Sequence, residues 1–330
     1  MKKKLFWKPK RTIILASWSG EEYGLIGSTA WGEKHSKGVL KRAIAYLNVD
    51  IGVSGKTFEL VSSATLVRLI KQVLKAVPDP EHPQDSVIRR WDGKFYPIGS
   101  GSDYAVFLHH LGIPSADMRF GANSGSGRAT DYGTYHSIFD SFSWMEKYAD
   151  PDFSFHQKMA IIWGVCALRL ADATTLPLFH LDQARIIQGE VERVERMVSD
   201  EKAFKEMQKA AKEYLDVSKD IDLKRRNHRS EDVDSELNNK LAFSERFFIA
   251  KEGLPRRKWF KHVLHAPGLY SGYSADYLPG IVQGKRDEKN QELANEQAYL
   301  FAARLQAVSR FLKSGKTSVE SIYSSNHDKA

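Results

Sequence analysis

The chain has 330 residues, of which 42% are hydrophobic and 27% are charged; this composition excludes a disordered or fibrous protein, and the length allows two compact domains. Cys166 is the only cysteine, which excludes an intrachain disulfide and a Cys-rich zinc site. The net charge of +8 does not indicate a nucleic-acid partner, because no recognised binding module accompanies it and six of the positive charges precede the first acid, Glu21: Lys2, Lys3, Lys4, Lys8, Lys10 and Arg11.

The first part of the chain alternates short apolar runs with helical patterns, which is typical of an α/β domain. Apolar runs predict strands at residues 12–17, 43–49 and 113–120. Helical spacing of apolar residues predicts helices at residues 21–35, 66–77, 102–111 and 155–173. The run at residues 13–18 is far shorter than the ~18 residues that span a bilayer, so we predict no membrane segment in this chain.

Beyond about Leu176 the pattern becomes helical, and four amphipathic stripes predict a four-helix bundle. The stripes lie at residues 187–198, 204–214, 234–248 and 294–312. The charge run at residues 219–234 predicts a solvated loop, and the Ser-rich tail at residues 314–330 predicts disorder. We therefore expect an α/β domain in residues 1–176 and an all-α four-helix domain in residues 177–313.

Candidate catalytic side chains occur at three places. Glu21 and Glu22 follow the first predicted strand, Asp50 ends the second, and His136 lies further along. Because sites in α/β proteins form at the carboxyl ends of strands, one carboxylate could bind a metal ion while its neighbour accepts a proton from water. Each signal also has a structural interpretation: Ser19 and Glu22 fit a helix capping box, Asp50 fits a turn, and a lone histidine is usually structural. Together they favour a zinc site, since zinc takes both imidazole and carboxylate ligands.

Five segments resemble those of a known family, in the family's order. The stretch RTIILASWSGEEYGLIGSTAW at residues 11–31 resembles the central motif of the glutamate carboxypeptidase and prostate-specific membrane antigen family of zinc metallopeptidases, relatives of the transferrin receptor. The other segments are AYLNVD at 45–50, GSGSDY at 99–104, YHS at 135–137 and YLPGI at 277–281. The resemblance runs from about residue 6 to residue 313. It implies an incomplete zinc-exopeptidase-type mixed sheet flanked by helices, followed by a helical domain that forms homodimers.

The resemblance also implies roles for the matching residues. Glu21 would be the general base, Glu22 and Asp50 would bind different zinc ions, and His136 would be a further zinc ligand. The implied reaction is hydrolysis of a peptide bond in a peptide substrate. Intact family members are often anchored by a transmembrane helix with the peptidase part outside the cytoplasm, whereas the localisation of this chain is not predicted. The positions that match the family's substrate pocket are Ser100, Gly101, Arg119, Tyr135 and Tyr273.

The sequence departs from the family in two respects. The family's zinc site also uses a histidine and a bridging aspartate upstream of the Glu-Glu motif, and residues 1–20 contain neither. We therefore expect a truncated chain that cannot form the complete dizinc centre alone. Among the basic residues that bind acidic substrates in the family, only Arg119 is matched, because Leu60, Asp117 and Gly272 stand where two arginines and a lysine are expected. We therefore expect an exopeptidase whose substrate specificity is broader than a strict preference for acidic dipeptides.

Two other interpretations stay open beside a truncated zinc exopeptidase. The chain could be a catalytically inactive dimerisation or binding protein of the transferrin-receptor type. Its basic N-terminus could also be an interaction tail for anionic lipid or nucleic acid.

Overall fold

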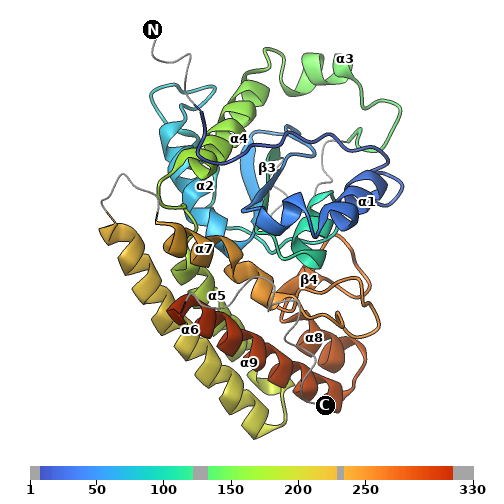
Figure 1. The fold of residues 1–330 in the computed structure, drawn as a ribbon. Helices are drawn as coiled ribbons and strands as arrows, with labels where there is room; N and C mark the ends of the chain where they lie inside the picture. The colour runs from blue at the N-terminus through green and yellow to red at the C-terminus, as the bar shows by residue number, and fades with distance from the viewer. Residues whose placement is uncertain (1–7, 122–132, 229–233, 315–330) are drawn as a thin grey trace.

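The structure, a computed structural model, describes residues 8–121, 133–228 and 234–314. The first part of the chain forms a small sheet with flanking helices, and the second part forms a helical region in which the long helices α6 and α9 lie side by side (Figure 1). One hydrophobic cluster extends from the sheet to the last helix, so the two parts share a core.

Three strands form the main sheet, in the order β1-β3-β2. The central strand β3 (Ser115–Gly121) pairs in parallel with β1 (Tyr46–Asn48) and antiparallel with β2 (Thr57–Ser62). Burial alternates along β2, as expected for a strand with one face on the core. The sheet is therefore mixed, and Asp50 follows the carboxyl end of β1.

Helices cover the sheet and bury their apolar faces against it. Helix α4 (Ser154–Asp172) contacts both β3 and helix α2 (Ala64–Ala76). The buried face of α2 has the helical spacing expected from the sequence: Leu66, Leu69, Ile70, Val73 and Leu74. The other elements of this part are α1 (Ile26–His35), η2 (Val39–Arg42), η3 (Val87–Arg90), the π-helix η4 (Val106–His110), α3 (Phe142–Trp144) and η5 (Met145–Ala149).

Four helices dominate the second part of the chain. Helix α6 packs against both α5 and α9, which buries the apolar stripes predicted at residues 187–198, 204–214 and 294–312, whereas the stripe at 234–248 is divided between α7 and η7. None of the helices in the described ranges is long and apolar enough to cross a membrane. The elements are α5 (His180–Arg193), η6 (Glu195–Met197), α6 (Glu201–Asn227), α7 (Ser235–Phe243), η7 (Ser244–Phe248), β4 (His265–Pro267), β5 (Ala275–Tyr277), α8 (Pro279–Val282), η8 (Gln283–Asp287) and α9 (Gln291–Ser314).

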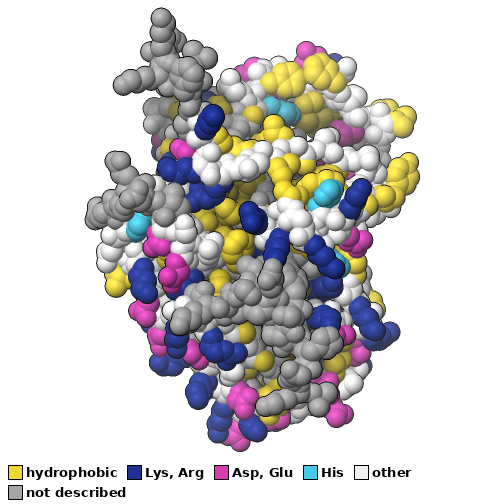
Figure 2. Space-filling model, in the orientation of Figure 1, with side chains coloured by type: hydrophobic (Ala, Val, Ile, Leu, Met, Phe, Trp, Pro, Cys, Tyr) yellow, Lys and Arg dark blue, Asp and Glu magenta, His cyan; other side chains and the backbone are white. Residues whose placement is uncertain are grey.

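The predicted strand at residues 12–17 is absent. These residues are irregular, and the Ile14 and Leu15 side chains are 51% and 76% exposed. An apolar run becomes a strand only when a neighbour accepts its backbone hydrogen bonds, and in the described sheet only β1, β2 and β3 pair. Apolar side chains accordingly gather on the upper half of the surface in Figure 2, which is formed by the first part of the chain.

Several further predictions need correction. The helix predicted at 21–35 begins only at Ile26, and its N-cap, Leu25, makes no side-chain capping bond, so the capping-box interpretation of Glu22 is wrong. The loop predicted at 219–234 is helical as far as Asn227, because Ile221 continues the buried stripe and Asp222 pairs with arginines one turn later.

The second part is also not all-α, since β4 and β5 form an antiparallel pair. Strand β2 was not predicted. Ser314, the predicted first residue of the tail, instead ends α9, and residues 315–330 lie outside the described residues.

Candidate active site

A tight turn immediately before α1 carries Glu21 and Glu22. Gly20 and Gly24 adopt positive φ angles of 68° and 102°, a region that glycine occupies without strain. The Glu21 carbonyl accepts backbone hydrogen bonds from Gly24 (3.0 Å) and Leu25 (2.8 Å), which closes the turn. The sequence SGEEYG therefore folds so that both carboxylates precede the helix instead of lying along it.

Glu22 meets His136, which is distant in the sequence. His136 Nε2 lies 3.2 Å from Glu22 Oε2, and both side chains are largely exposed. His136 has a positive φ of 55°, and the Tyr135 ring stacks on its imidazole with centroids 3.8 Å apart. Two atoms bound at ~2.0–2.1 Å to one tetrahedral zinc ion lie roughly 3.3 Å apart, so this pair has the spacing of ligands that share an ion.

Glu21 lies among other carboxylates. Burial, reinforced by the negative charges of Asp50, Glu22 and Asp103, raises the pKa of Glu21 to about 7. Burial also raises the pKa of Asp103, whose Oδ1 has no hydrogen-bond partner among the described residues. A cluster of this kind gains stability from a bound cation, which would lower the pKa of each acid. Asp103 was not among the predicted site residues, although it lies in the GSGSDY segment that resembles the family.

A pocket of about 60 Å³ opens beside Asp50. It brings together four of the five predicted substrate residues, namely Gly101, Arg119, Tyr135 and Tyr273. The fifth, Ser100, is not among the lining residues; its backbone N–H and its hydroxyl donate to the Gly272 carbonyl at 2.8 and 3.1 Å. Tyr273 comes from the second part of the chain, so both parts build the pocket.

Gly99→Ala is expected to lower the free energy of unfolding by about 1–3 kcal/mol and to displace the Tyr273 loop from the pocket. A Cβ atom at Gly99 would lie 2.7 Å from the Tyr273 carbonyl oxygen and 2.8 Å from that of Gly272, closer than contacts of this kind allow. Urea unfolding would measure the loss. Gly164→Ala is the matched control, because nothing lies within 4 Å of a Cβ there and alanine favours helix α4; equal losses in the two variants would contradict the packing argument.

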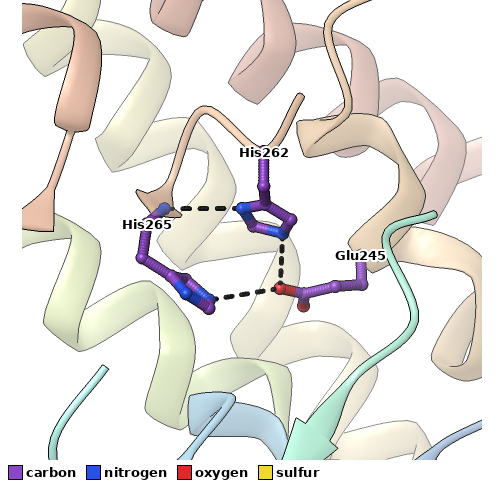
Figure 3. A group of neighbouring side chains, drawn as sticks. All are labelled: Glu245, His262 and His265. Atoms are coloured by element: carbon purple, nitrogen blue, oxygen red, sulfur yellow. Dashed lines mark hydrogen bonds and ion pairs between the residues drawn. The ribbon is translucent and has the colours of Figure 1, made fainter. Parts of the chain in front are cut away.

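A second group of ligand-type side chains lies deep in the protein (Figure 3). Within the described residues, Glu245, His262 and His265 form the one group of three whose ligand atoms all lie within 4.8 Å of one another, and all three are buried. His262 Nδ1 accepts the His265 backbone N–H at 3.4 Å, so the ring proton sits on Nε2 and is donated to Glu245 Oε1 at 3.1 Å. Gln183 Nε2 donates to the other Glu245 oxygen at 2.7 Å.

These contacts fit a structural hydrogen-bond cluster better than a metal site. A metal ion on His262 Nε2 would require the ring proton to move to Nδ1, where it would face the His265 N–H donor. Burial lowers the pKa of His262 to about 3, which keeps the ring neutral. We therefore assign no ion to Glu245, His262 and His265.

Two family models match the chain. Residues 2–153 match peptidase family M28, and residues 196–313 match the transferrin receptor-like dimerisation domain. Among curated relatives, a probable glutamate carboxypeptidase LAMP1 of Arabidopsis thaliana is 36% identical over 282 residues, which cover 83% of this chain and 40% of the relative.

Two further relatives extend this likeness. A probable glutamate carboxypeptidase AMP1 of Arabidopsis thaliana is 33% identical over 331 residues, 94% of this chain and 45% of the relative. The aminopeptidase NAALADL1 of Mus musculus is 31% identical over 308 residues, 84% of this chain and 40% of the relative. The chain thus spans less than half the length of these relatives. On these matches, the chain belongs to the M28 peptidases that carry a transferrin receptor-like dimerisation domain.

Proposed function

We propose that this chain carries the general base and three zinc ligands of a zinc-dependent exopeptidase that hydrolyses peptide bonds. The contact that supports this most directly is the 3.2 Å approach of His136 to Glu22, beside Glu21 with its raised pKa. Membership of the M28 family supports the same reaction class. The names of the relatives include both a glutamate carboxypeptidase and an aminopeptidase, so the end of the peptide that is cleaved stays open.

The donor set fits zinc. Glu22 and His136 offer a carboxylate oxygen and an imidazole nitrogen at the spacing of a shared ion, and Asp50 would hold a second ion. Bound zinc would supply Lewis acidity, which activates water and polarises the peptide carbonyl. Glu21 would accept the proton of the attacking water and pass it to the leaving amine. The two further ligands that the resemblance calls for, a histidine and a bridging aspartate, are not among residues 1–20.

Zinc titration of the full chain, followed by elemental analysis after dialysis, tests the ligand assignment. We expect bound zinc that is lost, or weakened at least about 100-fold, in both Glu22→Ala and His136→Ala, because each change removes one of the ligands. Glu213→Ala is the control, since Glu213 lies on helix α6 in an exposed pair with Lys313. Zinc retained by both site variants would refute the assignment. Absence of zinc from the unmodified chain would fit either an incomplete zinc site or a catalytically inactive relative.

We also propose that the chain forms a homodimer through residues 177–313. The match of residues 196–313 to a transferrin receptor-like dimerisation domain supports this arrangement. Sedimentation equilibrium would test it, and a monomer at micromolar concentration would count against it.

A further inference from the structure

The charge of the pocket beside Asp50 bears on which substrates it accepts, an inference that rests on the proposed function. Three acidic side chains line the pocket, Asp50, Glu59 and Asp117, whereas Arg119 is the one basic side chain among its described lining residues. If Asp50 binds a zinc ion, two carboxylates and one guanidinium are left to face a substrate. Neither the sequence patterns nor the family matches singled out Glu59.

Glu59 holds the Arg119 guanidinium. The register of β2 and β3 places the two residues directly opposite each other, and Arg119 Nε donates to Glu59 Oε2 at 2.8 Å while a terminal nitrogen reaches the same oxygen. The side chains are only 16% and 11% exposed, so water screens the pair weakly. A Cβ atom on Gly121 would overlap the Glu59 carboxylate, so glycine at that position is what lets Glu59 take this place.

Asp117 adds a second acidic side chain, and the Arg119 charge acts on it while pairing directly with Glu59. It lies two residues before Arg119 on β3, and Asn48 Nδ2 donates to its Oδ1 at 3.1 Å. That amide bond favours the charged form of the carboxyl group, whereas burial raises the pKa of Asp117 to about 7. An acidic substrate group would therefore meet the Asp117 carboxyl group and an Arg119 guanidinium that is already paired with Glu59. An ammonium or amide group would find hydrogen-bond acceptors there.

We propose that this pocket selects a cationic or hydrogen-bond-donating substrate side chain, such as that of lysine or glutamine, over an acidic one, and that Glu59 and Asp117 determine the choice. The pocket volume of about 60 Å³ holds a few water molecules, enough for a terminal ammonium or amide group with part of its stem.

Binding of Ala-Lys, Ala-Gln and Ala-Glu to the full zinc-supplemented chain tests this selectivity. The three dipeptides share both termini and differ only in the side-chain group. Calorimetric titration should give a Kd for Ala-Lys at least about tenfold lower than for Ala-Glu, with Ala-Gln between them. Glu59→Gln leaves the Arg119 charge without its carboxylate partner, so the ratio should fall to about one or invert.

Asp117→Asn is the second variant and should reduce the same ratio if Glu59→Gln fails to fold. Glu213→Gln removes one negative charge outside the pocket and should leave the ratio unchanged. Ala-Glu binding as tightly as Ala-Lys, no dipeptide binding at all, or ratios that neither pocket variant alters would each overturn the proposal. Selective binding without hydrolysis of any dipeptide would instead support the pocket assignment and contradict the proposed activity. Hydrolysis of the dipeptides without preference would support the proposed activity and contradict the pocket assignment.

Discussion

Arg246→Met is expected to lower the free energy of unfolding by about 3–5 kcal/mol. The Arg246 side chain is fully buried, and its guanidinium donates to the backbone carbonyls of Leu40 (3.1 Å), Ala43 (2.8 Å) and Ala242 (3.4 Å). It also stacks on the Phe243 ring, 4.8 Å from the centroid. Methionine keeps the apolar stem but removes every donor, so each of these carbonyl oxygens loses its hydrogen bond from Arg246.

Urea unfolding followed by far-UV circular dichroism would measure this loss. Arg256→Met is the matched control: Arg256 is 71% exposed, and its contact with Glu288 is a long 3.8 Å, so a change within about 0.5 kcal/mol is expected there. Similar losses in the two variants would show that the Arg246 hydrogen bonds contribute little.

Arg246 also explains how the second part of the chain can supply a residue to the pocket. It lies in η7, and two of its acceptors lie in and just after η2, in the first part of the chain. The loop that carries Tyr273 docks in the same way across the two parts, through the Gly272 carbonyl and Ser100. Disruption of the Arg246 contacts is therefore expected to loosen the pocket as well as the core.

The helices were predictable because their signal is local. The apolar stripes of α2, α4 and α9 repeat within a few residues of sequence, and each stripe is buried in the structure. The run at residues 12–17 had an equally clear pattern, but a strand depends on a partner elsewhere in the chain, and none of the described strands pairs with it. The charged segment that ends at Asn227 shows the opposite error: it was predicted to be a loop because of its polarity, but it is helical and buries Ile221.

The residues of the candidate site were likewise predictable only where the signal is local. The turn with Glu21 and Glu22 and the acid after β1 could be located from motif and strand position alone. The approach of His136 to Glu22 depends on how distant segments pack, which no local pattern encodes. The pairing of Glu59 with Arg119 depends on strand register, and β2 itself was not predicted. Residue type therefore identified candidate ligands, whereas charge balance in the pocket required the fold.

Glu21→Gln is expected to reduce zinc-dependent dipeptide hydrolysis by about 10²- to 10⁴-fold. Glutamine keeps the size of the side chain but cannot accept the proton of an attacking water. Glu21 suits that task because burial and the charges of Asp50, Glu22 and Asp103 raise its pKa to about 7, which makes its carboxylate a stronger base than that of a solvated glutamate. Initial rates of Ala-Lys cleavage by the zinc-loaded chain would measure the effect, with Glu33→Gln on α1 as a control that leaves the rate unchanged.

The zinc content of the Glu21→Gln variant distinguishes a general base from a zinc ligand. A general base that does not bind the metal ion can be changed to glutamine with its zinc retained, so the rate should fall while the zinc stoichiometry and affinity stay at the values of the unmodified chain. Glu22→Gln should instead weaken both, because Glu22 and His136 lie at ligand spacing. Parallel loss of zinc and activity in Glu21→Gln would make Glu21 a ligand, and an unchanged rate would remove it from the mechanism. No hydrolysis by the unmodified, zinc-loaded chain would contradict peptidase activity by this chain alone, as expected if its dizinc centre is incomplete.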